Sequence, residues 1–351
     1  MGKKIKTRKI VKYYVYEEEE KEVDKKKISY LLFLLLLTGV LLSTSTYAWF
    51  TTNRVVSVNT LNVKVQAEGS LEISVDGTNW KPGINQDEII AAHTTNYPSS
   101  TNQLPSVIEP VSTNGALDGT GFMQMYLGEV KSNDNGDYII TSKKSIETES
   151  NGDTSDGKFV AFDIFLKTTE AKDLYLTTES KITYNGNTST GTENAMRVAF
   201  IIEGNTSAGD SLASIQALRT NDVNNVYIWE PNYDTHTPNG VTNARDVYGI
   251  TTSLTGAARL TYDGVISEIT EAENITLGNA KASNYPTKFA TVNPKITTPT
   301  ANGAYQLLFN LQAGITKMRV YLWLEGQDVD CENNASVGDL AFTLQFSTNP
   351  S

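Results

Sequence analysis

Short hydrophobic runs, each bounded by turn-forming residues, follow one another along most of the chain after residue 55. Residues 340–346 alternate between large apolar and small or polar side chains, which indicates a strand with one buried face. Residues 159–166 are almost continuously apolar, as expected of a strand that is buried on both faces. The runs that predict strands are 55–65, 70–75, 122–130, 138–141, 159–168, 174–178, 181–184, 197–203, 226–229, 306–312, 318–324 and 340–347.

The connections between these strands are long, notably 79–120 and 231–300, and they are rich in Asn, Gly and Asp. One helical pattern, residues 211–219, predicts a short crossover helix. The pattern therefore favours an all-β protein: a Greek-key or jelly-roll-like β-sandwich with long loops and one short helix. We expect one extracellular domain over 49–351, with a small second lobe within 205–300 as the alternative.

The N-terminal region differs from the rest of the chain. Residues 1–27 form a charged segment with ten basic and six acidic side chains, and residues 28–48 carry no charge. A basic segment followed by an apolar helix is typical of an export signal, with the basic side remaining in the cytoplasm. We predict cleavage after Ala48, which leaves Trp49 at the mature N-terminus. The alternative is an uncleaved anchor that contacts the membrane only through residues 28–50.

The junction after the apolar segment carries a recognisable pattern. Thr46, Tyr47 and Ala48 are followed by the aromatic Phe50, and residues 60–63 read Thr-Leu-Asn-Val. Residues 43–66 thereby resemble the export junction of the TasA/camelysin-like surface and biofilm-matrix proteins of Gram-positive bacteria. The resemblance implies cleavage by a signal peptidase and a secreted matrix or fibre protein. It does not carry a metalloprotease activity, because the chain contains no H-E-x-x-H.

The charge balance excludes several classes of protein. The net charge is −11, and the +4 of residues 1–27 leaves −15, the difference between the two, for residues 28–351. A domain this acidic repels phosphates, so nucleic acid is not an expected partner. One Cys and two His exclude a disulfide framework and a Cys/His metal cluster within one chain.

Candidate catalytic groups are few, and we predict that the protein is not an enzyme and has no catalytic residues. The two histidines, His93 and His236, fall in predicted loops. His236, with Glu230 and Asp234 nearby in sequence, is the better acid–base or metal candidate. Cys331 lies among acidic residues that raise a thiol pKa, which indicates a half-buried structural cysteine.

No cofactor is predicted, with structural Ca²⁺ as the alternative. The oxygen ligands would come from alternate positions of one acidic segment: Asp328, Asp330, Glu332 and Asn334. A binding surface for sugars would need exposed aromatic rings. Trp229, before a Glu-Pro-Asn loop, and Tyr233 are the candidates, whereas Trp323 is expected in the core.

These features lead to two hypotheses about function. The first is a secreted or surface-attached structural protein of a bacterial extracellular matrix, which assembles with itself or with related matrix subunits through β-strand addition. The assembly strand is 55–65, with a register break near residues 59–60 and with apolar side chains at Val56, Val58, Leu61, Val63 and Val65. We expect charges at Val58 and Val63 to block assembly while leaving a compact domain. The alternative is a carbohydrate- or surface-binding adhesin module anchored at the membrane.

Overall fold

A computed structural model of the chain describes residues 29–30, 33, 56–66, 71–132, 138–145, 147, 157–185, 191–231, 236–246, 264–266, 275–276, 289–291, 296–297, 305–326, 328, 330–331 and 339–350. The chain divides into two units, Met1–Ala48 and Trp49–Ser351. The predicted signal segment lies outside the described residues except for Ser29, Tyr30 and Phe33, which are helical. Among the described residues, no helix is both long enough and apolar enough to cross a bilayer. Cleavage after Ala48 remains a prediction.

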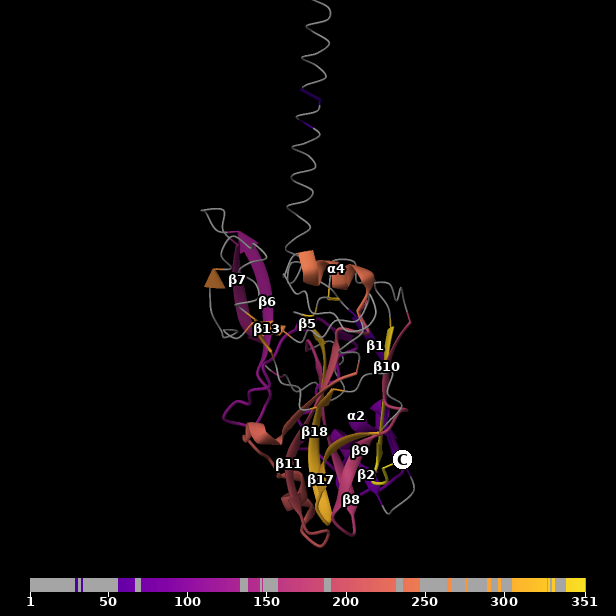
Figure 1. Cartoon of the computed structure of the whole chain (residues 1–351). Coiled ribbons are helices and arrows are strands. Elements are labelled where there is room, and N and C mark those ends of the chain that lie inside the picture. The colour runs from indigo at the N-terminus through magenta and orange to yellow at the C-terminus, as the bar shows by residue number, and fades with distance from the viewer. Residues whose placement is uncertain are drawn as a thin grey trace, which may run out of the picture. The chain divides into compact units, whose positions relative to one another are not determined.

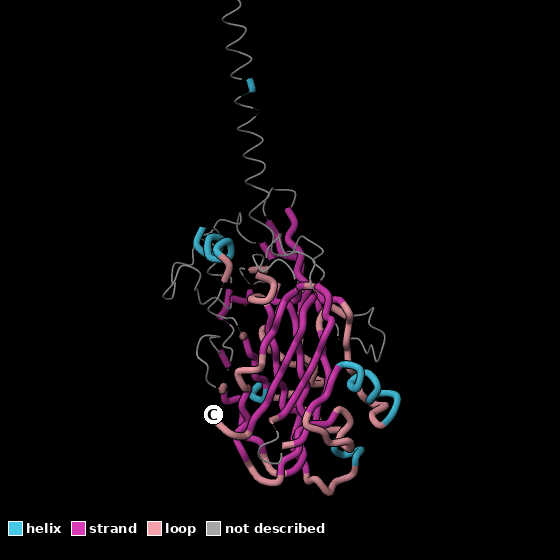
Figure 2. Tube along the Cα trace, turned by 90° about the vertical axis from the view of Figure 1, so that its right-hand side faces the viewer, coloured by secondary structure: helices cyan, strands magenta, loops and turns pink. Residues whose placement is uncertain are grey.

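The second unit is mostly β-structure, which confirms the all-β class (Figures 1 and 2). Its strands are β1 (Val56–Val65), β2 (Glu72–Ser74), β3 (Gly83–Asn85), β4 (Val107–Ile108), β5 (Pro110–Val111), β6 (Met125–Ser132), β7 (Tyr138–Ser145), β8 (Val160–Thr168), β9 (Lys172–Leu176), β10 (Lys181–Asn185), β11 (Met196–Thr206), β12 (Val226–Glu230), β13 (Gly264–Ile266), β14 (Ile275–Thr276), β15 (Phe289–Thr291), β16 (Ile296–Thr297), β17 (Gln306–Leu311), β18 (Gly314–Glu325) and β19 (Asp339–Ser347). Its helices are α2 (Gln86–Thr95), α3 (Leu212–Gln216), α4 (Pro238–Asp246) and the 3₁₀ turn η2 (Val223–Asn225).

Two seven-stranded sheets contain most of these strands. Sheet A has the order β17-β9-β19-β1-β3, with β10 also paired to β19 and β4 also paired to β1. Sheet B has the order β16-β12-β11-β18-β8-β2, with β5 also paired to β18. A pair β13-β15 and a three-stranded sheet β14-β7-β6 complete the described strands.

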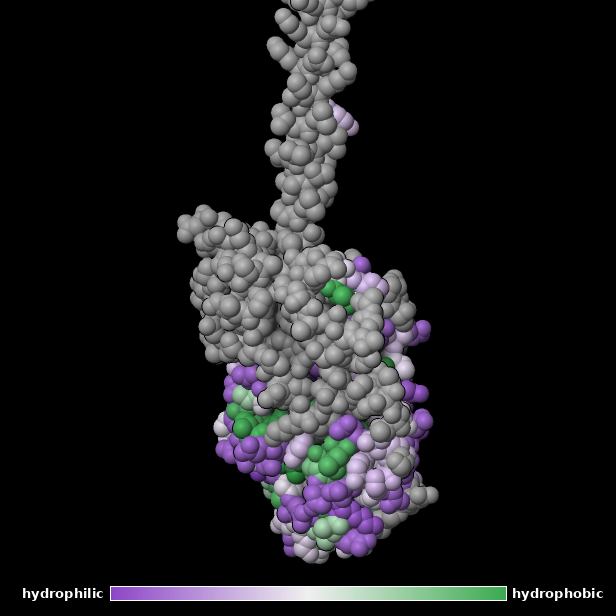
Figure 3. Space-filling model, in the orientation of Figure 1, coloured by the Kyte–Doolittle hydropathy of each residue, from purple (hydrophilic) through white to green (hydrophobic). Residues whose placement is uncertain are grey.

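The two large sheets share one hydrophobic core. A single cluster of buried side chains includes Val63 and Leu344 from sheet A together with Phe162 and Val320 from sheet B. The rings of Phe200 (sheet B) and Phe346 (sheet A) meet edge to face, with centroids 5.8 Å apart. Large apolar side chains are exposed at only two described positions of this unit, Val223 and Leu307. On the face shown in Figure 3, hydrophilic side chains predominate among the described residues, and apolar patches lie between them.

The other face of sheet B is covered as well. Two further buried clusters lie there, one around Phe159, Tyr321 and Trp323 and one around Tyr97 and Phe165. β8 is therefore buried on both faces, as its continuous apolar run predicts. Because side chains alternate between the two faces of a strand, charged residues at alternate positions of β8, β11 and β18 are placed inside the protein.

β1 lies in the interior of sheet A and not at its edge. It pairs in parallel with the last strand, β19, and antiparallel with β3 and β4. The register with β19 shifts between Val58 and Thr60, which confirms the predicted break. All five apolar side chains proposed for the assembly strand are at most 5% exposed. The expectation that charges at Val58 and Val63 leave the domain intact is therefore wrong for the monomer, because both residues belong to its core.

The long predicted connections contain helices that the hydrophobic pattern does not reveal. Residues 79–120 include α2, which begins at a capping box: Asn85 Oδ1 accepts from the backbone N–H of Glu88, and the Glu88 carboxylate accepts from the N–H of Asn85. Residues 231–300 include α4, which starts at a proline, a residue suited to the first helical position. The predicted helix at 211–219 is confirmed as α3.

Candidate functional site

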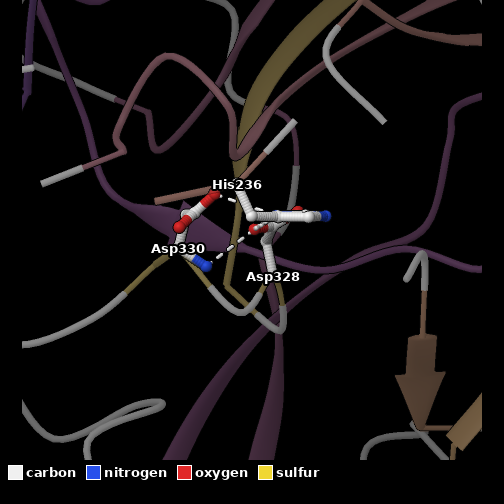
Figure 4. A group of neighbouring side chains, drawn as sticks. All are labelled: His236, Asp328 and Asp330. Carbon is white, nitrogen blue, oxygen red and sulfur yellow. Dashed lines mark hydrogen bonds and ion pairs between the residues drawn. The ribbon is translucent and has the colours of Figure 1, made fainter. Parts of the chain in front are cut away.

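Two of the predicted metal ligands meet the better histidine candidate in one buried cluster. His236 precedes α4, and Asp328 and Asp330 follow β18. His236 Nδ1 lies 2.9 Å from Asp330 Oδ2 and 3.9 Å from Asp328 Oδ1, and the three side chains lie side by side (Figure 4). All three are at most 2% exposed.

The Asp330 carboxylate accepts hydrogen bonds at both of its oxygens. Its Oδ1 accepts from the backbone N–H of Thr237 at 3.0 Å and from the Thr237 hydroxyl at 2.8 Å. Its Oδ2 accepts from Asn194 Nδ2 at 3.2 Å in addition to His236. Gly240 leaves the room for this arrangement, because a Cβ there would come within 2.2 Å of Asp330 Oδ1. The carboxylate thereby fixes the start of α4 against the end of β18.

Arg197 on β11 connects this group to a third carboxylate. Its Nη2 lies 2.5 Å from Glu230 Oε1 on β12 and 2.6 Å from Asp328 Oδ2. Burial would lower the pKa of Arg197, but the charges of Glu230 and Asp328 outweigh it and raise the pKa. The guanidinium therefore remains charged inside the protein, where a paired charge is tolerated and an unpaired one is not.

His236 is the titratable member of the cluster. Burial would lower its pKa, but the hydrogen bond to Asp330 and the charges of Asp328 and Asp330 outweigh burial and raise it. Its Nε2 is buried and has no hydrogen-bond partner among the described residues, and in Figure 4 this end of the ring points away from both carboxylates. His236 and Asp330 have the geometry of an acid–base dyad, and both side chains are fully buried.

The ligand atoms of this cluster lie close enough together to share a metal ion, but its carboxylates also accept hydrogen bonds. The ligand atoms of His236, Asp328 and Asp330 lie within 4.8 Å of one another, which is compatible with one shared cation. However, Asp330 already accepts four hydrogen bonds, and Asp328 accepts from Arg197 and from the backbone N–H of Asp330. Among the described residues, these contacts join Arg197, His236, Asp328 and Asp330 in one buried ionic cluster.

Three other residues singled out in the sequence, Trp229, Trp323 and Cys331, are buried. Trp229 on β12 is 3% exposed, so the expectation that it is an exposed ring is wrong: β12 pairs with the central strand β11, and its indole packs into the shared core. Trp323 is buried, as predicted, and Cys331 is buried and not half-buried. His93 lies on α2 and not in a loop, with Nδ1 3.4 Å from Ser100 Oγ.

Other candidates fall outside the described residues: Glu332, Asn334, Tyr233 and Asp234.

The sequence reasoning did not identify the second ionic cluster, on the covered face of sheet B. There Lys317 and Arg319 on β18 face Asp163 on β8 and Glu203 on β11. The available signal was the alternation of these two basic residues with apolar ones along β18. That alternation indicates a solvated face when a strand is read by itself, and only the tertiary structure shows that the face is covered.

Known proteins give no guide to either cluster. No family model matches the chain, and no match was found among curated proteins or solved structures.

Proposed function

We propose that this chain is exported and is a structural subunit of a bacterial extracellular matrix or cell-surface coat, assembling by exchange of β1 between copies. The observation that carries the proposal is the position of β1. The first strand that the structure describes in this unit completes the middle of a sheet by pairing with β19, over the register from Ser57↔Asp339 to Val65↔Phe346. The same hydrogen bonds and the same apolar contacts form when β1 is supplied by a second copy.

Further support comes from the resemblance of residues 43–66 to the export junction of TasA/camelysin-like matrix proteins. We further propose a Greek-key or jelly-roll connectivity. Supporting it, the chain moves repeatedly between the sheets: β8 is in sheet B, β9 and β10 are in sheet A, and β11 is again in sheet B. Such crossings are typical of Greek-key sandwiches.

The adhesin alternative is less favoured by the described residues. One of its two predicted ligand aromatics, Trp229, is buried. A non-enzymatic role remains our proposal, and the enclosed position of His236 supports it.

A redox-controlled lock tests strand exchange directly. Asn62 on β1 and Thr343 on β19 are register partners, and both side chains are partly exposed. In a chain with Cys331→Ser, the pair Asn62→Cys and Thr343→Cys forms a disulfide within one copy under oxidation, because neighbouring strands bring the two Cα atoms into bridging range. Negative-stain microscopy and light scattering then compare oxidised and reduced protein.

We expect filaments from the reduced protein and monomers from the oxidised protein. If the protein is oxidised after assembly, the same disulfide joins different copies, and a non-reducing gel shows a ladder. The single variant Asn62→Cys, treated identically, controls for oxidation. Filaments from the pre-oxidised double variant would rule out exchange of β1, and absence of filaments under all conditions would favour the adhesin.

Export is tested separately by N-terminal sequencing of the extracellular form. We expect it to begin at Trp49. An intact segment 1–27 on the cell-associated protein would instead show an uncleaved anchor.

A further inference from the structure

Three charged side chains from three adjacent strands converge on the covered face of sheet B. Lys317 lies on β18, which pairs with β8 on one side and with β11 on the other. Lys317 Nζ lies 3.3 Å from Asp163 Oδ2 on β8 and 3.5 Å from Glu203 Oε2 on β11. None of the three residues is more than 2% exposed. The Lys317 amine is thus in contact with the carboxyl group of Asp163 in a site without bulk water, which places Nζ beside the Cγ atom that it would attack.

Backbone acceptors fix the position of the amine. Lys317 Nζ donates to the carbonyl oxygens of Gln216 and Leu218, both at 3.0 Å. These carbonyls belong to the end of α3 and to the segment that follows it. These bonds use two of the three N–H groups of the Lys317 ammonium, so the third is directed toward Asp163 and Glu203.

Two donors polarise the Asp163 carboxyl group. Arg319 Nη1 lies 2.5 Å from Oδ1, and the Tyr97 hydroxyl donates to Oδ2 at 2.7 Å. The guanidinium is held in turn by Glu147 and by the carbonyl oxygen of Thr101. A fixed cation at Oδ1 stabilises negative charge that develops on that oxygen when a nucleophile attacks Cγ.

Glu203 is placed to carry protons. It lies at a β-bulge, where the register between β11 and β18 shifts from Ile202 to Gly204, and this re-aims its side chain toward Lys317. Neither carboxylate oxygen accepts a hydrogen bond from a described residue, and Oε2 also lies 3.2 Å from Arg219 Nε. Burial and then the charge of Asp163 raise the pKa of Glu203 to about 7, although Lys317 and Arg219 oppose the shift. A carboxyl group with such a pKa both accepts and returns a proton near neutral pH.

We propose that Lys317 and Asp163 condense spontaneously in the folded protein to form an intramolecular amide, with Glu203 as the proton carrier. The Lys317 ammonium transfers a proton to Glu203, and the neutral Nζ attacks Asp163 Cγ. The new Cγ–Nζ bond forms as the Cγ–Oδ2 bond breaks, and Oδ1 becomes the amide oxygen opposite Arg319. Of the three ammonium protons, one remains on the amide nitrogen, and two pass by way of Glu203 to Oδ2, which leaves as water. The reaction requires no oxidant, cofactor or second substrate.

The amide would tie the centre of sheet B covalently. It joins β8 to β18 and closes the chain from residue 163 to residue 317 into a ring. Like a disulfide, a link that closes a long loop restricts the unfolded chain and stabilises the folded one. Unlike a disulfide, it survives reduction.

The test is mass spectrometry of the purified full chain under denaturing, reducing conditions. The expected intact mass is lower by one water molecule than the sequence mass of the recovered form, and peptide mapping should find one branched peptide in which Lys317 is joined to Asp163. The variants Lys317→Arg and Glu203→Gln are expected to keep the full mass and to migrate differently from the wild type on a denaturing gel. Circular dichroism verifies that each variant is folded.

The chain contains a matched control for proximity alone. Lys167 Nζ and Glu72 Oε2 lie closer, at 2.5 Å, but they are partly exposed. This pair is expected to remain unlinked, and Lys167→Arg should keep the mass deficit of the wild type. Complete recovery of Lys317 and Asp163 in linear peptides from the wild type would overturn the proposal, and so would a link from Lys317 to Glu203. A link that persists in Glu203→Gln would remove Glu203 from the mechanism as stated.

Discussion

Asp76 shows how one buried carboxylate organises a turn in this protein. It follows β2, and its Oδ1 accepts from the Ser74 hydroxyl at 2.8 Å and from the backbone N–H groups of Thr78 and Asn79 at 2.9 and 2.8 Å. Its Oδ2 accepts from the side-chain amides of Asn79 and Asn96, which ties the turn to the end of α2. Burial would raise the pKa of Asp76, but these hydrogen bonds outweigh it and lower the pKa to about 2.

We predict that Asp76 contributes to acid sensitivity. A carboxyl whose pKa falls from 3.8 to about 2 on folding stabilises the protein by about 2 kcal/mol above pH 4, and this contribution is lost as the pH falls toward 2. Asp76→Asn should therefore lower the free energy of unfolding at neutral pH by at least this amount and should flatten its acid dependence. Urea titrations at several pH values measure both. The exposed Asp87→Asn is the control, and an equal effect there would contradict the prediction.

His236 has the opposite pH dependence. Its pKa is raised in the folded state, so its contribution to stability is complete below its unfolded value of 6.5 and is lost as the pH rises through the folded pKa. His236→Gln should remove this decline and, at low pH, cost about 1–3 kcal/mol because the charge-assisted bond to Asp330 is lost. The only other histidine, His93, gives the control His93→Gln, which removes an imidazole that lies outside this cluster. A wild type whose stability is constant from about pH 5 to about pH 9 would contradict the assignment.

The hydrogen bonds and ion pairs of Asp328 and Asp330 lead to a prediction about cations. We expect EDTA to leave the melting temperature unchanged, because Arg197 and His236 already pair with these carboxylates. Differential scanning calorimetry with and without added Ca²⁺ measures this. A melting temperature that falls when EDTA is added and recovers when Ca²⁺ is added would instead place a structural ion at these residues.

At the level of elements, the strands were predictable and the helices within long connections were not. Alternation and continuous apolar runs identified β8, β11, β18 and β19, because burial of a strand face imposes a period of two on the sequence. α2 has only two buried apolar side chains, Ile89 and Ala92, so its hydrophobic period is weak. Its capping box, Asn85 with Glu88, was the readable signal, since these two residues satisfy N–H groups that a helix start leaves unpaired.

The capping box gives a prediction for α2. Asn85→Ala should lower the free energy of unfolding by about 1 kcal/mol, because the N–H of Glu88 loses its acceptor. Glu88→Gln is the matched control: it removes the ion pair with Lys81 but keeps an oxygen that can accept from the N–H of Asn85. We expect the control to change stability by a few tenths of a kcal/mol. A larger loss from Glu88→Gln than from Asn85→Ala would show that the ion pair, and not the cap, supports the helix.

At the scale of the whole molecule, the ionic clusters lay beyond sequence reasoning for a topological reason. His236 and Asp330 are 94 positions apart, and Arg197 and Asp328 are 131 apart. The local sequence pattern singled out His236, Asp328 and Asp330, but not Arg197. The contacts among the four residues depend on which strands become neighbours. The order β12-β11-β18 brings these groups together, and no local signal fixes that order.

The same topology makes the whole second unit depend on β1, and this gives the last prediction. The strand buries five apolar side chains, each worth about 2 kcal/mol, so its removal costs about 10 kcal/mol. That loss is comparable with the entire stability of a typical domain, about 5–15 kcal/mol.

A chain of residues 67–351 should therefore lose its near-ultraviolet circular dichroism and unfold without a cooperative transition, whereas 49–351 folds. Because β1 is held in the unit by strand pairing and by its buried side chains, a synthetic peptide of residues 56–66 should restore the cooperative transition when added to 67–351. The same peptide with Val63→Asp should not, because it would bury an unpaired charge in the core. Restoration would show that the sheet accepts β1 from another chain, as strand exchange requires. A chain of 67–351 that folds unaided would show that β1 is dispensable, contrary to its position between β19 and β3.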